Sequence, residues 1–396
     1  MILRKGYRFQ LKPTTQEKSL LRQFVGCARF VWNAVLSLNE LLAEHGEKRF
    51  RYSGMCSYLV HLKAENEFLR DAPSQPLQQA LRDLDLAYSR AFDKKLPARM
   101  PHKKYKGRPA GIRFPQGFRV NGSGVFLPKI GWIGFRKSRE IEGTIKNITV
   151  SHDGVRWYVS MQTEREIPDP VHPSTSEIGI DLGVNRFAAC SDGTFLEGSN
   201  SFQKHQSRLA LLQGRMAKKN KYSANWWKAR LCVTRLQRKI KDTRGDMLNK
   251  ASTTISKSHA VVVMEDLRIT NMTASAKGTI EEPGTRVSAK SGLNRRVLDQ
   301  GWGEFRRQLG YKLEWLGGIL YLVDPKNTSR TCAECGHVSA DNRQTQAEFR
   351  CVGCGHSDHA DTNAAINILR RAGHAQIACG DAPLGASMKQ EAQLVA

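Results

Sequence analysis

Two closely spaced cysteine pairs near the C-terminus constrain the fold of this chain more than any other feature. Cys332 and Cys335 form the first pair, Cys351 and Cys354 form the second, and fifteen residues separate the pairs. Each pair lies in a Cys-x-x-Cys-Gly-His segment, where the glycine lets the backbone turn so that its amides face the sulfurs. This spacing is typical of a zinc ribbon with four thiolate ligands. Because four ligands close the site, we expect a structural Zn²⁺ with no catalytic role.

The remaining cysteines and the apolar segments indicate a reducing cytoplasm. The five other cysteines are scattered along the chain: Cys27, Cys56, Cys190, Cys232 and Cys379. An odd and scattered set argues against the disulfide framework of a secreted protein. The start, "MILRKGYRFQLKP", lacks the apolar region of a signal peptide, and no segment approaches the roughly 18 apolar residues of a membrane span. We therefore expect no membrane partner.

The charge balance points to a polyanionic partner. Lys and Arg total 62 against 37 Asp and Glu, a formal net charge of +25. Residues 94–119 hold nine basic residues and no acid, and residues 203–250 hold fourteen against two. Each segment could be an ordinary solvated surface, but the one-sided charge favours nucleic acid. The candidate contacts are Lys103, Lys104, Lys106, Arg108, Lys218, Lys219 and Lys221.

The first half of the chain alternates between strand and helix patterns. Residues 2–11 have the two-residue alternation of a strand, and the pattern becomes helical from Pro13 to Gly46. Two more helical blocks are expected over 57–70 and 73–95, followed by short strands over 124–135 and 144–164. The N-terminal strand is expected to join these later strands, so that the helices form an insertion in one β-domain.

A Pro- and Ser-rich linker over 165–176 separates the second half. There we expect short strands over 177–198, a helical region over 203–250, and an apolar strand that ends in an acid at Glu265. A helix over 299–318 and a strand over 319–325 are expected to follow. Residues 270–296 have the composition of a long loop, whose length suits a lid or gate. The tail after Gly373 is expected to be unstructured.

Three acidic residues occupy unusual positions. Asp181 lies inside the apolar strand "IGIDLG", Glu265 ends "AVVVME", and Asp361 precedes the helical segment "TNAAINIL". Taken singly, the first two could be ordinary polar residues at strand ends, and the third could be a helix N-cap. Acids in apolar strands are rare unless they are paired or bind metal. Together they have the layout of an RNase H-type site, in which three carboxylates converge on paired divalent cations.

With these residues, the sequence resembles the TnpB family of insertion-sequence proteins, RNA-guided nucleases related to type V CRISPR effectors. The matching segments are "GCARFVWNAVL", "LQQALRDLDLAY", "GIDLGVNRFAACSDG", "VVVMEDL", "GWGEFRRQLGYK" and the ribbon that leads into "ADTNAAINIL". The resemblance covers about residues 1–372. It implies an α+β multidomain chain with an RNase H-like RuvC nuclease domain, a β-barrel wedge domain and a helical recognition domain.

The resemblance also implies domain boundaries. The wedge domain would be split between residues 1–12 and 110–172, with the recognition domain inserted at 13–109. The RuvC domain would occupy 173–396, with the zinc ribbon at 328–358 and a disordered tail at 373–396. By folding around zinc, the ribbon could fix the helix that carries Asp361, which is our hypothesis for its position.

The implied activity is RNA-guided cleavage of double-stranded DNA next to a short target-adjacent motif. Asp181, Glu265 and Asp361 would hold Mg²⁺, with two ions per site expected, and the guide RNA would derive from the element end. Gln78 matches a position that contacts the motif in the family. His359 departs from the pattern, since the family often has Asp there. A bacterial or archaeal cytoplasm is expected, with the protein associated with the nucleoid.

Two other functions compete with this interpretation. A transposase that carries out DNA strand transfer would also need carboxylates, but its usual acid order is Asp, Asp, Glu, whereas this chain presents Asp, Glu, Asp. A non-catalytic zinc-ribbon regulator would bind nucleic acid without needing all three acids. Retention of the three acids favours an enzyme.

Overall fold

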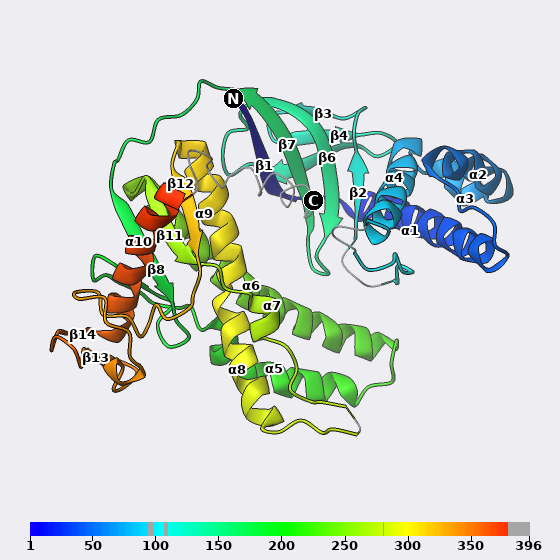
Figure 1. Cartoon of the computed structure of the whole chain (residues 1–396). Helices are drawn as coiled ribbons and strands as arrows, with labels where there is room; N and C mark the ends of the chain where they lie inside the picture. Colours follow the sequence, from blue (N-terminus) through cyan, green and yellow to red (C-terminus); the bar gives the residue numbers. More distant parts are fainter. Residues whose placement is uncertain (94–97, 107–109, 280, 379–396) are drawn as a thin grey trace. The chain divides into compact units, whose positions relative to one another are not determined.

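The computed structural model describes residues 1–93, 98–106, 110–279 and 281–378 (Figure 1). The chain divides into two compact units, Met1–Ile167 and Pro168–Ala396. The division falls inside the Pro- and Ser-rich segment that the sequence predicts to be a linker. It lies a few residues before the boundary at 172/173 that the resemblance implies.

The first unit is built on a seven-stranded antiparallel sheet. Its strands are β1 (Ile2–Leu11), β2 (Ala110–Phe114), β3 (Arg119–Asn121), β4 (Gly124–Leu127), β5 (Gly131–Arg136), β6 (Thr144–His152) and β7 (Trp157–Glu166). Their order is β2-β6-β7-β1-β5-β4-β3. Strand β1 pairs with β7 from Ile2 opposite Glu166 to Gln10 opposite Tyr158. The N-terminal strand therefore lies in the middle of the later sheet, as the alternation predicts. Closure of this sheet into a wedge barrel stays a prediction.

The helices of the first unit lie between β1 and β2 in the chain. They are α1 (Thr15–Glu44), α2 (Tyr52–Glu65), α3 (Glu67–Asp71) and α4 (Ser74–Ala91). Thr14 and Glu17 form a capping box that fixes the start of α1, since each side chain accepts from the other residue's amide. The apolar faces of α1 and α4 share one buried core with the sheet, in which Val31 and Leu81 join Phe9. The helical insertion therefore folds together with the sheet of its own unit.

The second unit contains a five-stranded mixed sheet. Its strands are β8 (Glu177–Leu182), β9 (Ala188–Cys190), β10 (Phe195–Leu196), β11 (Val261–Glu265) and β12 (Ile319–Val323), in the order β10-β9-β8-β11-β12. Strands β8, β11 and β12 are parallel, and β9 and β10 continue the sheet in antiparallel pairs. The carboxyl ends of β8 and β11 therefore meet at one edge.

Helices cover both faces of this sheet (Figure 1). Helix α6 (Ala224–Ser258) and helix α9 (Trp302–Leu316) pack on one face, where Leu248 and Phe305 contact the cluster that contains Ile180. Helix α10 (Ala360–Ala378) packs on the other face, where Ile368 and Val263 share a smaller cluster. The remaining helices are α5 (Ser201–Ala217), α7 (Ile269–Met272) and α8 (Val287–Gln300). None of the helices in the described ranges is apolar over a length that could cross a membrane.

Two sequence-based expectations need correction. A continuous loop over 270–296 is wrong at both ends, because α7 continues to Met272 and α8 begins at Val287. The Asn294 side chain on α8 donates to the carbonyl oxygens of Thr273 and Ala274, so packing against the preceding segment stabilises a weakly helical sequence. The disordered tail expected from residue 373 is wrong at its start, because α10 continues to Ala378. Residues 379–396, and with them Cys379, lie outside the described residues.

Candidate metal centres

Strand register brings Asp181 and Glu265 to the same edge of the five-stranded sheet. The last paired residues of β8 and β11 are Ile180 and Met264, so each acid is the next residue on its strand. Side chains alternate between the faces of a strand, so Asp181 shares a face with Gly179, and Glu265 shares a face with Val263. Gly179 and Val263 both face α10. The two acids therefore point toward the helix that carries the third.

The first turn of α10 completes this arrangement. Asp361 is its second residue, and a cavity of about 280 Å³ lies between it and the strand ends. The residues that line this cavity are Asp181, Leu182, Gly183, Val184, Asn185, Arg186, Glu265, Pro325, Thr328, Ser329, Arg343, Gln346 and Asp361. The structure thus brings together the three acids that the sequence singles out from three separate segments.

The pKa values of two carboxyl groups in the cavity are raised above their ordinary values. Burial, together with the neighbouring charges of Glu265 and Asp361, raises the pKa of Asp181 to about 7 against the opposing effect of Arg343. Burial also raises the pKa of Glu265, against a hydrogen bond from Thr328 and the charge of Arg371. Carboxylates that disfavour one another's ionised form favour a bound cation. The donor set consists of the oxygen ligands that Mg²⁺ prefers.

Arg343 is a cavity residue that sequence reasoning missed. Its Nη2 atom donates to Asp361 Oδ1 at 3.0 Å and to the carbonyl oxygen of Gln346 at 2.9 Å. The residue lies between the two cysteine pairs, in a stretch where one more arginine carries no distinctive signal. Only the fold of the ribbon back onto α10 brings its charge into the cavity.

His359, at the position where the family often has Asp, forms part of the cavity's surroundings. Its Nδ1 atom accepts from the amide of Asp361 at 3.2 Å, and its Nε2 atom lies 3.3 Å from Arg186 Nη1. The ring also packs edge-on against Phe195, with centroids 5.0 Å apart. His359 therefore helps to position the first turn of α10 and contributes no carboxylate.

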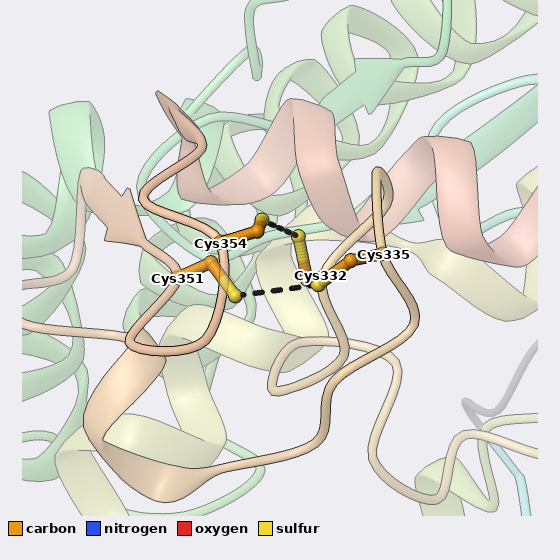
Figure 2. Close-up of side chains that lie close together, drawn as sticks. All are labelled: Cys332, Cys335, Cys351 and Cys354. Atoms are coloured by element: carbon orange, nitrogen blue, oxygen red, sulfur yellow. Dashed lines mark hydrogen bonds between the residues drawn. The ribbon is translucent and has the colours of Figure 1, made fainter.

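The four ribbon cysteines form a compact cluster (Figure 2). All four sulfur atoms lie within 4.8 Å of one another. Both knuckles have the same turn, because the amides of Gly336 and Gly355 donate to the carbonyl oxygens of Cys332 and Cys351 at 3.0 Å and 2.9 Å. Both glycines have a positive φ, near 75°, which only glycine adopts without strain. Four thiols so arranged match the tetrahedral ligand set of Zn²⁺.

The electrostatics of one cysteine also suit a metal ligand. Burial alone would raise the pKa of the Cys351 thiol, but hydrogen bonds from the amides of Cys354 and Gly353, together with those from the thiols of Cys335 and Cys354, bring its pKa to about 6. Metal ions bind the thiolate, so these amides prepare the sulfur for coordination. Within the described ranges, the four thiols are the one group of three or more His, Cys, Asp or Glu side chains that could hold a single ion together.

Two buried asparagines join the ribbon to α10. The Asn363 side chain accepts from the amide of Ala333 and donates to the carbonyl oxygen of Thr331, both at 2.8 Å. Asn367, one turn later, donates to the carbonyl oxygens of Thr328 and Thr331 at 3.1 Å and 2.6 Å. The hydroxyl of Thr328 in turn donates to Glu265 Oε1. The base of the ribbon is therefore hydrogen-bonded both to the helix of Asp361 and to Glu265.

The predicted nucleic-acid contacts belong to both units of the chain. Gln78 is exposed on α4, and the other exposed positions are Lys103, Lys104, Lys106, Lys218, Lys219 and Lys221. The ammonium of Lys104 lies 3.4 Å from the ring centroid of Trp32, and burial lowers its pKa, so this cation already has a partner within the chain. Arg108 lies outside the described residues. Lys218, Lys219 and Lys221, which belong to the same unit as the carboxylate cavity, do not line it.

Comparison with known proteins agrees with this architecture. Residues 158–276 match the OrfB_IS605 family, described as "Probable transposase", and residues 302–368 match the "Cas12f1-like, TNB domain" family. Residues 1–48 match a family described as "Helix-turn-helix domain", although in this structure they form β1 and the single long helix α1.

Two relatives cover almost the whole chain. One, from Escherichia coli (strain K12), carries the name "Putative RNA-guided DNA endonuclease InsQ"; it is 47% identical over 98% of this chain and 96% of its own. Another, from Streptomyces pristinaespiralis, is also named an RNA-guided DNA endonuclease and is 33% identical over 96% of this chain and 92% of its own.

A solved structure shares the fold. The protein in the cryo-EM structure of a Cas12f1–sgRNA–target DNA complex aligns with a TM-score of 0.52 and 14% identity, over 93% of this chain and 98% of its own. At 14% sequence identity, this match shows a similarity of fold and nothing about function. Together with the relatives, it confirms the resemblance drawn from the sequence motifs. The chain belongs to the OrfB_IS605 family, the TnpB family of insertion-sequence proteins.

Proposed function

We propose that the chain is an RNA-guided DNA endonuclease that hydrolyses phosphodiester bonds in the cavity formed by β8, β11 and α10. The observation that carries the proposal is the convergence of Asp181, Glu265 and Asp361 on one cavity, where burial raises the pKa values of the two strand-end acids, Asp181 and Glu265. The names of the relatives that align over the whole chain describe the same activity.

In this proposal the cavity is a RuvC site that holds two Mg²⁺ ions through the three carboxylates. Paired divalent cations supply a reactive water at neutral pH and stabilise the negative charge that develops on the phosphate. Thr328 orients Glu265 by its hydrogen bond, and Arg343 keeps Asp361 directed into the cavity. Arg343 also brings a positive charge to the space where a phosphodiester would bind.

The zinc ribbon has a structural role in this account. Cys332, Cys335, Cys351 and Cys354 would hold one Zn²⁺ with no open position, so the ion takes no part in cleavage. Its contribution is to keep Ala333 and Thr331 in place as partners of the α10 asparagines. The ribbon thereby fixes the direction of the helix that begins at Asp361.

We propose the finer parts of the function by analogy with the family. The guide RNA would derive from the element end, and base pairing with it would select the double-stranded DNA target. The residues at 13–109 would form the recognition domain, with Gln78 reading the target-adjacent motif, and those at 1–12 and 110–172 would form the wedge. The RuvC domain would occupy 173–396. The protein would act in the cytoplasm of its bacterial or archaeal host, at the nucleoid.

The test is cleavage of a guided target. The full chain is expressed with its element end, the RNA that copurifies is sequenced, and a plasmid library with the complementary target beside a randomised flank is added with Mg²⁺. Cuts confined to plasmids with both the target and one flank sequence are expected. Strand joining would instead identify a transposase, and binding without cleavage would identify a regulator.

A further inference from the structure

The hairpin formed by α5 and α6 has an apolar seam of its own. Leu209 on α5 packs with Val233, Leu236 and Ile240 on α6, and Phe202, Leu212 and Met216 border this cluster. In Figure 1 the two helices run side by side, and their connection lies at the end of the pair that is remote from the sheet of the same unit. The apolar seam therefore accounts for the packing of α5 against α6, without a contribution from the residues that connect the two helices.

Three aromatic rings gather at that connection. Tyr222 contacts Trp226 and Trp227 with ring centroids 5.5 Å and 6.2 Å apart, and the two tryptophans are 4.8 Å apart. Tyr222 is 64% exposed and Trp227 is 38% exposed. The described residues that form the apolar seam do not include these three aromatic residues. We call these three residues the aromatic tip.

Positive charge surrounds the aromatic tip. The Lys221 ammonium lies 5.1 Å from the Tyr222 ring centroid, and the Arg230 guanidinium lies 5.0 Å from that of Trp227. Lys218 and Lys219, which follow the last residue of α5, are exposed. The two acids of residues 203–250, Asp242 and Asp246, each pair with a basic residue of the same helix. The tip therefore presents aromatic faces beside several lysine and arginine side chains.

The backbone at Tyr222 gives an independent indication. Its φ of 70° lies in the left-handed region, which disfavours bulky residues and suits glycine. Capping of α6 does not need this ring, because Ser223 accepts from the amide of Trp226. An exposed aromatic residue in a conformation that costs free energy indicates a role outside the hairpin's own stability.

We propose that the aromatic tip is a stacking site for an unpaired nucleobase, with Lys218, Lys219 and Lys221 on the adjoining phosphates. This inference rests on the proposed function, because it assumes a nucleic-acid ligand. Aromatic rings between cations fit single-stranded nucleic acid, whose bases offer a free π-face next to phosphate charge. A paired duplex hides those faces. The unpaired base can come from the guide RNA or from opened DNA.

The experiment measures two quantities: the affinity for an oligonucleotide and the dependence of that affinity on salt concentration. Full-length protein freed of RNA is titrated with a short single-stranded oligonucleotide containing 2-aminopurine, as RNA and as DNA, and with the matching duplex. Tyr222→Gly combined with Trp227→Leu should weaken single-strand binding about 5- to 150-fold and abolish the quenching of 2-aminopurine that stacking causes. Trp227→Phe, which keeps a planar face, should retain most of both. Duplex binding should be unchanged.

The matched variant removes charge and keeps the rings. Replacing Lys218, Lys219 and Lys221 by Ala should flatten the dependence of log affinity on log salt, whereas the aromatic variant should leave that slope as it is. Loss with the RNA oligonucleotide alone identifies a guide-RNA site, and loss with both identifies stacking that does not distinguish the sugar. Equal single-strand binding by wild type and aromatic variant overturns the inference, as does an equal loss of duplex binding. A wild type that binds no nucleic acid refutes the proposed function itself.

Discussion

The two sheets of this molecule shift the pKa values of their carboxyl groups in opposite directions. On the seven-stranded sheet, Glu164 accepts from Arg4 at the surface, and that hydrogen bond, aided by Lys146, lowers its pKa. At the end of the five-stranded sheet, burial and like charges raise the pKa values of Asp181 and Glu265. The first arrangement favours the ionised carboxylate and the second opposes it. Folding alone would not retain the second, so we assign the chemistry of the protein to the five-stranded sheet.

Removal of the zinc ligands should give the largest effect. Cys351→Ser is expected to lose the bound Zn²⁺ and to reduce guided cleavage below detection, because the ribbon would release Asn363 and Asn367 on α10. Elemental analysis and plasmid cleavage measure the two losses. Cys232→Ser, at an exposed position outside the cluster, should change neither. Full cleavage by a zinc-free protein would show that the ribbon does not support the carboxylate site.

The pH dependence of stability should differ between the two sheets' acids. An unfolded Asp has a pKa of about 3.9, so an Asp181 pKa of about 7 means that the folded protein holds a proton that the unfolded chain has released. The free energy of unfolding of the metal-free protein should therefore fall as the pH rises from about 4 to about 7, by about 1.4 kcal/mol for each unit of pKa difference. Glu265 acts in the same direction.

Asp181→Asn, which carries no charge at any pH, should remove most of this fall. Denaturant unfolding of both proteins at several pH values, with and without Mg²⁺, makes the comparison. Mg²⁺ should restore the wild type near neutral pH, since the ion binds the deprotonated carboxylates. If the free energy of unfolding depends on pH in the same way in the wild type and in Asp181→Asn, then Asp181 is not the source of the fall in stability.

Replacing one glycine in each sheet by alanine tests how closely neighbouring elements pack against that sheet. A Cβ atom on Gly179 would collide with the carbonyl oxygen of Ala365 on α10 and lie 2.8 Å from Leu369 Cβ, whereas one on Gly134 would have nothing within 4 Å. Gly179→Ala should cost about 1–3 kcal/mol of stability through overpacking. Gly134→Ala should be neutral or stabilise by about 0.5–1 kcal/mol. Chemical denaturation measures both, and equal effects would contradict the close packing of α10 on β8.

The smallest expected effect concerns motif reading in the first unit. Gln78→Ala should relax the preferred target-adjacent motif by roughly tenfold at one position, because a Gln amide can pair with both groups of an adenine edge. Ser89→Ala, exposed further along the same helix, is the matched control. Cleavage of a randomised-flank library reports the preference. A mutant library profile identical to that of the wild type would exclude Gln78 from motif reading.

Much of the carboxylate cavity is predictable because Asp181 and Glu265 lie in strongly patterned segments. The apolar runs around Asp181 and Glu265 require strands, and parallel strands bring their carboxyl ends together. The cysteine spacing fixes the ribbon just as locally. The strand patterns and the cysteine spacing are local signals that the sequence carries, whereas the pairing of β8 with β11 joins distant segments.

The unpredicted parts depend on contacts between distant segments. Arg343 enters the cavity only because Asn363 and Asn367 hold the ribbon against α10. Helix α8 has a mixed polar sequence, and its docking through Asn294 is a tertiary contact. The exposed ring of Tyr222 has no periodic pattern to mark it. Local pattern cannot reveal such features before the segments are folded together.

The most direct test of the account is guided plasmid cleavage by Asp181→Ala beside Asp242→Ala. Both variants remove one carboxylate, but Asp181 lines the cavity, whereas Asp242 pairs with Arg238 on the surface of α6. The account predicts that Asp181→Ala binds guide RNA as the wild type does and cuts no target, while Asp242→Ala cuts at the wild-type rate. Undiminished cleavage by a folded Asp181→Ala protein would contradict the assignment of chemistry to the five-stranded sheet.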